Sequence, residues 1–98
     1  RITEPAADLA VVLALASSRL DAPLPADAIA IGEVGLGGEV RRVGRVDARA
    51  QEAARLGFAR ALVPRGGHEK LRVAGAELVP VADVAEAVRW LRHPGPRS

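Results

Sequence analysis

The side chains of this sequence that could carry out covalent chemistry are few. A serine or threonine nucleophile needs a neighbouring base to activate it. Ser17 and Ser18 close an expected helix, and only distant loop residues could supply such a base. We therefore expect no hydrolytic dyad or triad among these groups. The hydroxyl groups are those of Thr3, Ser17, Ser18 and Ser98, and the candidate bases besides the carboxylates are His68, His93 and Lys70.

Motifs for binding metals and nucleotides are also missing from the sequence. There is no cysteine, and neither histidine has a second histidine or cysteine at ligand spacing. The glycines at positions 32, 35, 37 and 38 do not match the dinucleotide-binding fingerprint, and there is no Gly-Lys-Ser or Gly-Lys-Thr phosphate loop. We expect no metal ion, no cofactor and no small-molecule substrate.

Positive charge is the remaining chemical feature, and it is unevenly spread. Residues 41–72 hold nine basic and three acidic residues, a local charge of +6, although the net charge of the chain is only +2. Arginine binds phosphate or carboxylate through two parallel hydrogen bonds. The alternative for each cation is a solvated charge or an ion pair, with Glu39 or Glu52 as a near partner. The candidate phosphate-contacting residues are Arg41, Arg42, Arg45, Arg49, Arg55, Arg65, Lys70 and Arg72.

Three helices and four strands are predicted around this charged stretch. The first helix, residues 6–18, opens at Pro5 and is apolar on nearly every side, so we expect it to be buried against a sheet or a partner subunit. The second, residues 45–56, is amphipathic, and a third begins at Asp83. Strands are predicted over 28–34, 39–43, 58–63 and 77–81, with a glycine turn at 35–38 and a polar loop at 65–70. The apolar side of the second helix is expected to hold Val46, Ala50, Ala53, Ala54 and Leu56, and its wet side Arg45, Arg49, Glu52 and Arg55.

This order of elements predicts an α+β domain with helices packed on a small mixed sheet. We assign residues 1–92 to the domain and expect residues 93–98 to form a disordered tail. Residues 1–3 look like the end of a strand, which suggests an N-terminally truncated domain with an open sheet edge or an uncovered helix. Homo-oligomerisation would cover such a surface.

The sequence also allows a prediction of where in the cell the protein is found. No apolar run approaches the ~20 residues that cross a bilayer. Glu4 and Asp8 interrupt the first apolar run, which is unlike a signal peptide. We expect a soluble, cytoplasmic protein without membrane contact.

Several stretches resemble two related protein families. Residues 32–43 (GEVGLGGEVRRV) resemble the Gly-Glu-(Ile/Val)-x-Leu-x-Gly-x-Val segment of Lon-family proteolytic domains. Residues 4–10 (EPAADLA) with the serines at 17 and 18, residues 52–58 (EAARLGF) and the strand end at 63–64 are similar to the RadA/Sms family of bacterial DNA-repair ATPases. The resemblance covers essentially the whole chain and implies a ribosomal-S5-domain-2-like, Lon proteolytic-domain-like fold.

The resemblance also shows a departure from the proteases. Active Lon-type proteases carry their nucleophile in a Pro-Ser-Ala-Gly motif, and their catalytic lysine opens the helix after the hairpin. Pro5 matches the proline, while Ala6 stands at the serine position and Asp47 at the lysine position. Alanine has no oxygen to attack a carbonyl, and aspartate cannot act as the neutral amine base. The resemblance therefore implies a fold kept without its chemistry, so the chain is not expected to be an enzyme.

For function, the resemblance implies the C-terminal domain of a ring-forming, RecA-like ATPase of recombinational repair, with the ATPase site outside this chain. Such a domain would hold subunits in a ring and contact DNA phosphates, which carry no base readout. Phe58 and Trp90 are the only aromatic residues, so stacking on single strands is not expected and double-stranded DNA is favoured. The alternative is a purely structural oligomerisation module without DNA contact, whose arginines face acids on a neighbouring protomer.

Overall fold

The structure is a computed structural model that describes residues 7–94. The first strand stub, Pro5 and Ala6 lie outside the described residues, as do residues 95–98 of the expected tail. Along the chain the elements are α1 (Asp8–Leu20), β1 (Ala28–Ala30), β2 (Glu33–Val34), β3 (Val40–Arg41), α2 (Val46–Arg55), β4 (Arg60–Pro64), the 3-10 turn η2 (His68–Lys70), β5 (Glu77–Val81) and α3 (Val84–Arg92).

The strands confirm the predicted α+β class with mixed strand directions. β1, β4 and β5 form a parallel sheet in the order β1-β4-β5, and β2 pairs with β3 as an antiparallel hairpin. The expected single strand over 28–34 is wrong, because the chain leaves the parallel sheet at Gly32. There the carbonyl of Gly32 accepts a hydrogen bond from the backbone N–H of Leu9 at 3.0 Å instead of from a strand. A Cβ on Gly32 would also lie 2.8 Å from Cγ1 of Val40, so only glycine fits this crossing.

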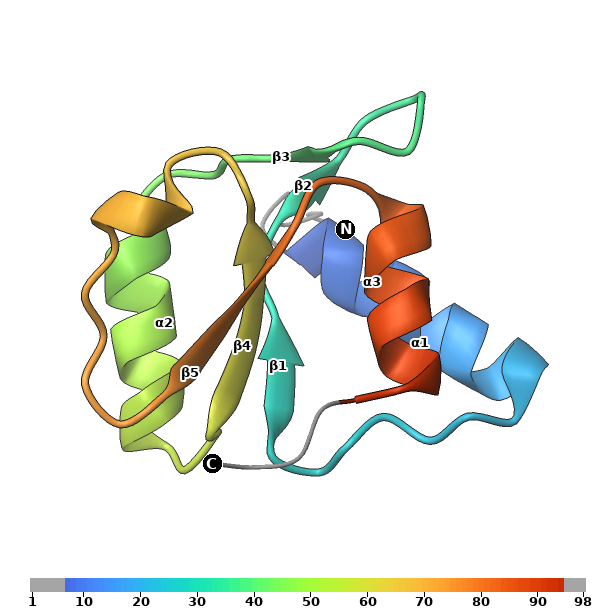
Figure 1. Cartoon of the computed structure of the whole chain (residues 1–98), viewed down its shortest axis with the longest axis horizontal. Helices are drawn as coiled ribbons and strands as arrows, with labels where there is room; N and C mark the ends of the chain where they lie inside the picture. The colour runs from blue at the N-terminus through green and yellow to red at the C-terminus, as the bar shows by residue number, and fades with distance from the viewer. Residues whose placement is uncertain (1–6, 95–98) are drawn as a thin grey trace, which may run out of the picture.

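Helices cover both faces of the parallel sheet. α2 lies against one face, while α1 and α3 lie together against the other (Figure 1). Every residue of the central strand β4 is buried as a result. On the α1/α3 side, Leu62 packs in one cluster with Leu9, Leu13 and Leu91.

The second helix meets the opposite face of β4 through small side chains. Because side chains alternate along a strand, Ala61 and Val63 face away from the Leu62 cluster, and both are buried. Ala50 and Ala53 are the buried residues of α2. The expected place of Leu56 on the apolar side is wrong, since it follows the last turn of the helix and is 64% exposed.

Within residues 7–94 the first helix is covered on one side, and the expected burial of its other side against a partner subunit stays a prediction. Leu9 and Leu13 face the core, whereas Val11 and Leu15 are 55% and 64% exposed. The sheet and the neighbouring helix α3 cover only one side of α1. The outer side of α1 therefore stays apolar and open within residues 7–94.

The third helix has a well-defined start that holds it to the hairpin. The side chain of Asp83 accepts a hydrogen bond from the N–H of Glu86 at 2.8 Å, and Glu86 accepts one from the N–H of Ala82 at 2.8 Å. This reciprocal arrangement resembles a capping box and satisfies N–H groups at the helix start. The N–H of Val84 also donates to the carbonyl of Gly38, which fastens the hairpin turn to α3.

Candidate nucleic-acid interface

A pocket of about 650 Å³ lies at the carboxyl end of the central strand β4. In open sheets with parallel strands, this edge is where ligands usually bind. Its walls come from the segment between β3 and α2, the start of α2, and the loop after β4. In Figure 1 the turn η2 lies above the start of α2, so segments about twenty residues apart in sequence form one site. The lining residues are Arg42, Val43, Arg45, Val46, Asp47, Pro64, Gly66, Gly67, Glu69, Lys70, Leu71 and Arg72.

Four of the eight predicted phosphate-contacting residues line this pocket. They are Arg42, Arg45, Lys70 and Arg72, and all four are exposed. None of them forms an ion pair with a carboxylate of residues 7–94. Unlike charges already neutralised by a neighbour, these cations can contact an anion without first losing a partner.

Two of the three guanidinium groups lie close to the backbone of the loop after β4. Arg42 lies against the glycine loop, where a Cβ on Gly67 would come within 3.2 Å of its Cζ atom. Gly67 also has φ +79°, a conformation that disfavours side chains. Arg72 donates to the carbonyl oxygens of Glu69 and Leu71, both at 2.9 Å. The glycine loop therefore allows the close approach of Arg42, and ordering of these side chains costs less on binding.

The start of α2 forms part of the same wall. Arg45 precedes the helix with φ 60° and ψ 41°, a left-handed conformation that is uncommon for a residue other than glycine. This turn brings Arg45, Val46 and Asp47 to the pocket wall. The first N–H groups of a helix have no intrahelical acceptor and favour anions.

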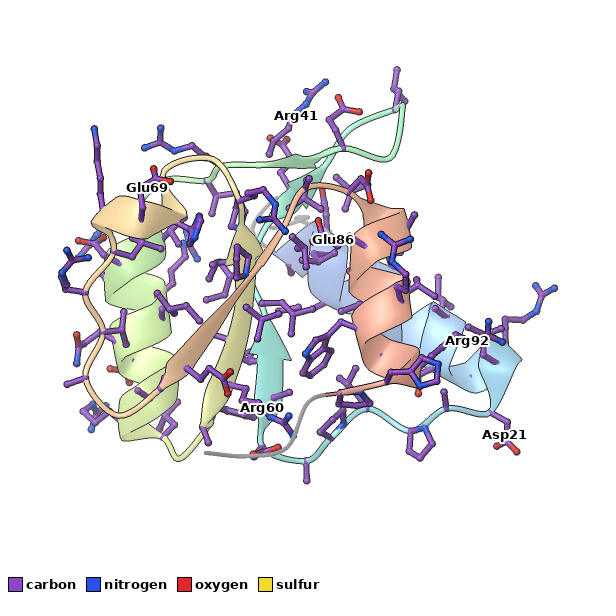
Figure 2. The ribbon with its side chains drawn as sticks, in the orientation of Figure 1. Asp21, Arg41, Arg60, Glu69, Glu86 and Arg92 are labelled. Atoms are coloured by element: carbon purple, nitrogen blue, oxygen red, sulfur yellow. The ribbon has the colours of Figure 1, made fainter. Side chains whose placement is uncertain are left out.

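Two carboxylates also line the pocket, and sequence reasoning did not assign either of them to a binding site. Asp47 accepts a hydrogen bond from the N–H of Ala48 at 2.8 Å, and Glu69 lies 3.7 Å from the His68 ring. Figure 2 shows Glu69 above the upper end of α2. The pocket therefore offers acceptors as well as cations. The only sequence signal for Glu69 was its position beside Lys70 in a glycine-rich loop.

Three predicted contact residues are instead paired with acids. Arg41 binds Glu39 at 2.7 Å and Arg55 binds Glu52 at 2.5 Å, as the ion-pair alternative predicted for these two glutamates. The pKa values of Glu39 and Glu52 lie below their usual value. The pKa of Glu39 is lowered mainly by a hydrogen bond from its own backbone N–H and next by the hydrogen bond from Arg41. The pKa of Glu52 is lowered mainly by the hydrogen bond from Arg55. Both pairs are exposed, and such pairs contribute little to stability.

The third paired cation, Arg65, is turned away from the pocket. Its guanidinium binds Glu86 at the start of α3 and donates to the carbonyl of Pro80 at 3.2 Å. Glu86 lies 21 residues further along the chain, so local sequence did not indicate this pair.

Glu86 gives a pH-dependent contribution to stability. Its pKa lies below the usual value, chiefly because the N–H of Ala82 donates to it and also because Arg65 pairs with it, while partial burial acts in the opposite direction. A lowered folded-state pKa stabilises the fold above the unfolded value, and this contribution is lost as the pH falls through the folded value. We expect Glu86→Gln to make the free energy of unfolding less dependent on pH below about 4.5, as measured by urea unfolding at several pH values. An equally steep acid loss in the variant would contradict this.

Two further arginines of the basic stretch lie outside the pocket. Arg49, one turn along α2, donates to the carbonyl of Gly44 at 2.9 Å. Arg60 is only 7% exposed, pairs with Asp27 at 3.4 Å and lies 5.3 Å from the centre of the Trp90 ring. Figure 2 shows Arg60 near the lower end of the sheet, far from Glu69. It is buried within the fold and is not a surface cation.

The structure describes only one of the two positions of the expected degenerate dyad. Asp47 lies in the first turn of α2, as the comparison with active proteases implied, and Ala6 lies outside the described residues. Within residues 7–94, no cluster of three histidine, cysteine or acidic side chains could hold a metal ion. No helix in that range is long and apolar enough to cross a membrane.

The fold and the pocket define a small α+β domain with a cationic pocket at the carboxyl edge of its parallel strands. No protein-family model matches the chain. It is similar to proteins named DNA repair protein RadA: 50% identical over 95% of the chain to the one from Mycolicibacterium smegmatis, 50% over 91% to that of Bacillus subtilis, and 43% over 90% to that of Escherichia coli. The chain belongs to the RadA family as its C-terminal segment and spans about a fifth of the length of these relatives. The specific Lon-like fold name remains an expectation.

Proposed function

We propose that this chain is a non-catalytic domain of a cytoplasmic DNA-repair protein that binds double-stranded DNA through its backbone phosphates and takes part in a homo-oligomeric ring. A DNA-repair role is supported by the names of its relatives. The observation that carries the DNA contact is the group of four cations around one pocket that have no acidic partner among residues 7–94.

Contact with phosphates follows from the kind of groups that are present. Arginine and lysine side chains and helix N-termini bind phosphate oxygens and carry no base readout. Neither of the two aromatic residues lines the pocket, so base stacking does not contribute there. This combination favours binding that is independent of sequence and prefers duplex to single strands.

Ring assembly is supported by the open side of the first helix. Val11 and Leu15 lie one helical turn apart on α1, and both are more than half exposed. Exposed apolar side chains that lie together on a helix favour contact with another protein surface. A neighbouring subunit would cover them.

Catalysis by this domain is not part of the proposal. The serine and lysine positions of the related proteases hold Ala6 and Asp47, which cannot act as nucleophile and amine base. The ATPase activity implied for the whole protein would lie in the four fifths of its relatives that this chain does not span.

The salt dependence of DNA binding tests the proposal. We expect labelled duplexes of unrelated sequence to bind equally well, with a slope of log K against log[salt] approaching about −3.6 if all four cations contact phosphates. Fluorescence anisotropy titrations at several salt concentrations give this slope.

The second candidate function is an oligomerisation module without DNA contact, which the open apolar side of α1 favours on its own. It predicts no binding at low salt by a sample that circular dichroism shows to be folded. That result would replace the DNA proposal.

A further inference from the structure

We infer that the cationic pocket binds a terminal phosphate monoester of a nucleotide, as found at the end of a DNA strand, more tightly than the internal phosphates of a duplex. This inference rests on the proposed function and specifies which part of the nucleic acid enters the pocket.

The first reason is the shape of the site. The phosphates of a continuous duplex lie on the outside of a cylinder, so they pass across the mouth of a pocket. The volume of about 650 Å³ lies within the ~300–1,000 Å³ of small-ligand pockets and leaves room beyond the mouth. A strand end has no chain beyond its last phosphate and can enter this space.

The second reason is charge. An internal phosphate diester carries one negative charge, whereas a terminal monoester carries about −1.5 to −2 near neutral pH because its second pKa is about 6. Arg42, Arg45, Lys70 and Arg72 surround the pocket and repel one another in the empty site. A dianion relieves that repulsion more than a monoanion does.

The third reason is the pair of carboxylates. Asp47 and Glu69 stand on the same walls and would repel a bare inorganic anion. They are matched by a ligand that has hydrogen-bond donors beside its phosphate, such as the amino groups of a base. A nucleotide carries amino donors at a distance from its phosphate, whereas the donors of inorganic phosphate are P–OH groups on the anion itself, so we expect the nucleotide to bind more tightly.

The test compares three forms of one duplex, each titrated with this chain. A dumbbell closed at both ends and a linear duplex with 5′-hydroxyl ends present internal phosphates, and the third form is the linear duplex with 5′-phosphates. We expect the 5′-phosphorylated form to bind about tenfold more tightly, a difference of roughly 1.4 kcal/mol. The preference should shrink as the pH falls below about 6, where the monoester loses its second charge.

A matched pair of variants assigns the effect to the pocket. Arg42→Ala with Arg72→Ala should remove the preference, while Arg41→Ala with Arg55→Ala, which removes the same charge from ion-paired sites, should keep it. Equal binding of phosphorylated and hydroxyl ends would overturn the inference, and so would a preference that survives in the Arg42/Arg72 variant. Binding of the dumbbell tests the proposed function separately, since the dumbbell has no ends.

Competition separates the two sources of a terminal phosphate. If a free nucleoside monophosphate displaces the phosphorylated duplex at a concentration similar to that of the strand ends, the ligand is a free nucleotide. Displacement only at concentrations far above those of strand ends identifies the DNA end. Displacement by inorganic phosphate as effective as by the nucleotide would overturn the role given to the nucleotide's own groups.

Discussion

Replacing Arg42, Arg45, Lys70 and Arg72 together by alanine is expected to weaken duplex DNA binding about a thousandfold at about 0.1 M salt. Each cation that contacts a phosphate releases counterions from the DNA, so removing four contacts removes most of the electrostatic driving force. The slope of log K against log[salt] should become flatter by about 3.6. Anisotropy titrations of the variant and the parent chain at matched salt measure both changes.

The control for this variant removes the same charge elsewhere. Changing Arg41, Arg55, Arg89 and Arg92 to alanine also takes four positive charges from a chain of net charge +2. Arg41 and Arg55 are paired with acids, and Arg89 and Arg92 lie on α3, across the sheet from α2. If overall charge alone attracted DNA, both variants would lose the same affinity, which would contradict binding at the pocket.

Leu62→Ala is expected to lower the free energy of unfolding by about 2–5 kcal/mol. Leu62 is 1% exposed and packs from the central strand against Leu9 and Leu13 of α1 and Leu91 of α3. Three elements meet at this side chain, so none of them can move to fill the cavity without disturbing the other two. In a domain whose total stability is about 5–15 kcal/mol, this loss is large. Urea unfolding followed by circular dichroism measures it.

Leu56→Ala is the matched control because it makes the same chemical change at a 64% exposed position. Its effect should stay within about 0.5 kcal/mol. Similar losses in the two variants would show that an effect on the unfolded state determines the result, and would contradict the assigned role of the Leu62 cluster.

Much of the secondary structure followed from local patterns. The glycine turn, the helix that begins after Asp83 and the strand at 77–81 lie where the sequence predicted them. The predicted ends of the strands were less accurate where contacts between distant segments change the path of the backbone. The strand expected over 58–63 is Arg60–Pro64, and the strand expected over 28–34 is divided because Gly32 bonds to α1 instead of continuing the sheet.

The sequence predicted that the candidate site would be rich in basic residues, but it did not predict which of those residues would form the site. Charge counting found the basic stretch, and the proximity of Glu39 and Glu52 in sequence indicated the pairs of Arg41 and Arg55. The pairing of Arg65 with Glu86 joins distant segments, so no local pattern could show it. The burial of Arg60 beneath Trp90 depends on how α3 packs and was equally hidden.

The sequence by itself determined the class of fold and the density of positive charge, because residue type and short-range periodicity are properties of the chain. Only the tertiary structure decided which cations have no acidic partner in the described part of the chain and that four of them surround one pocket. The physical reason is that an ion pair forms only where two side chains come within a few ångströms of each other. That distance is set by how the loop after β4 folds over the start of α2, which no spacing along the chain encodes.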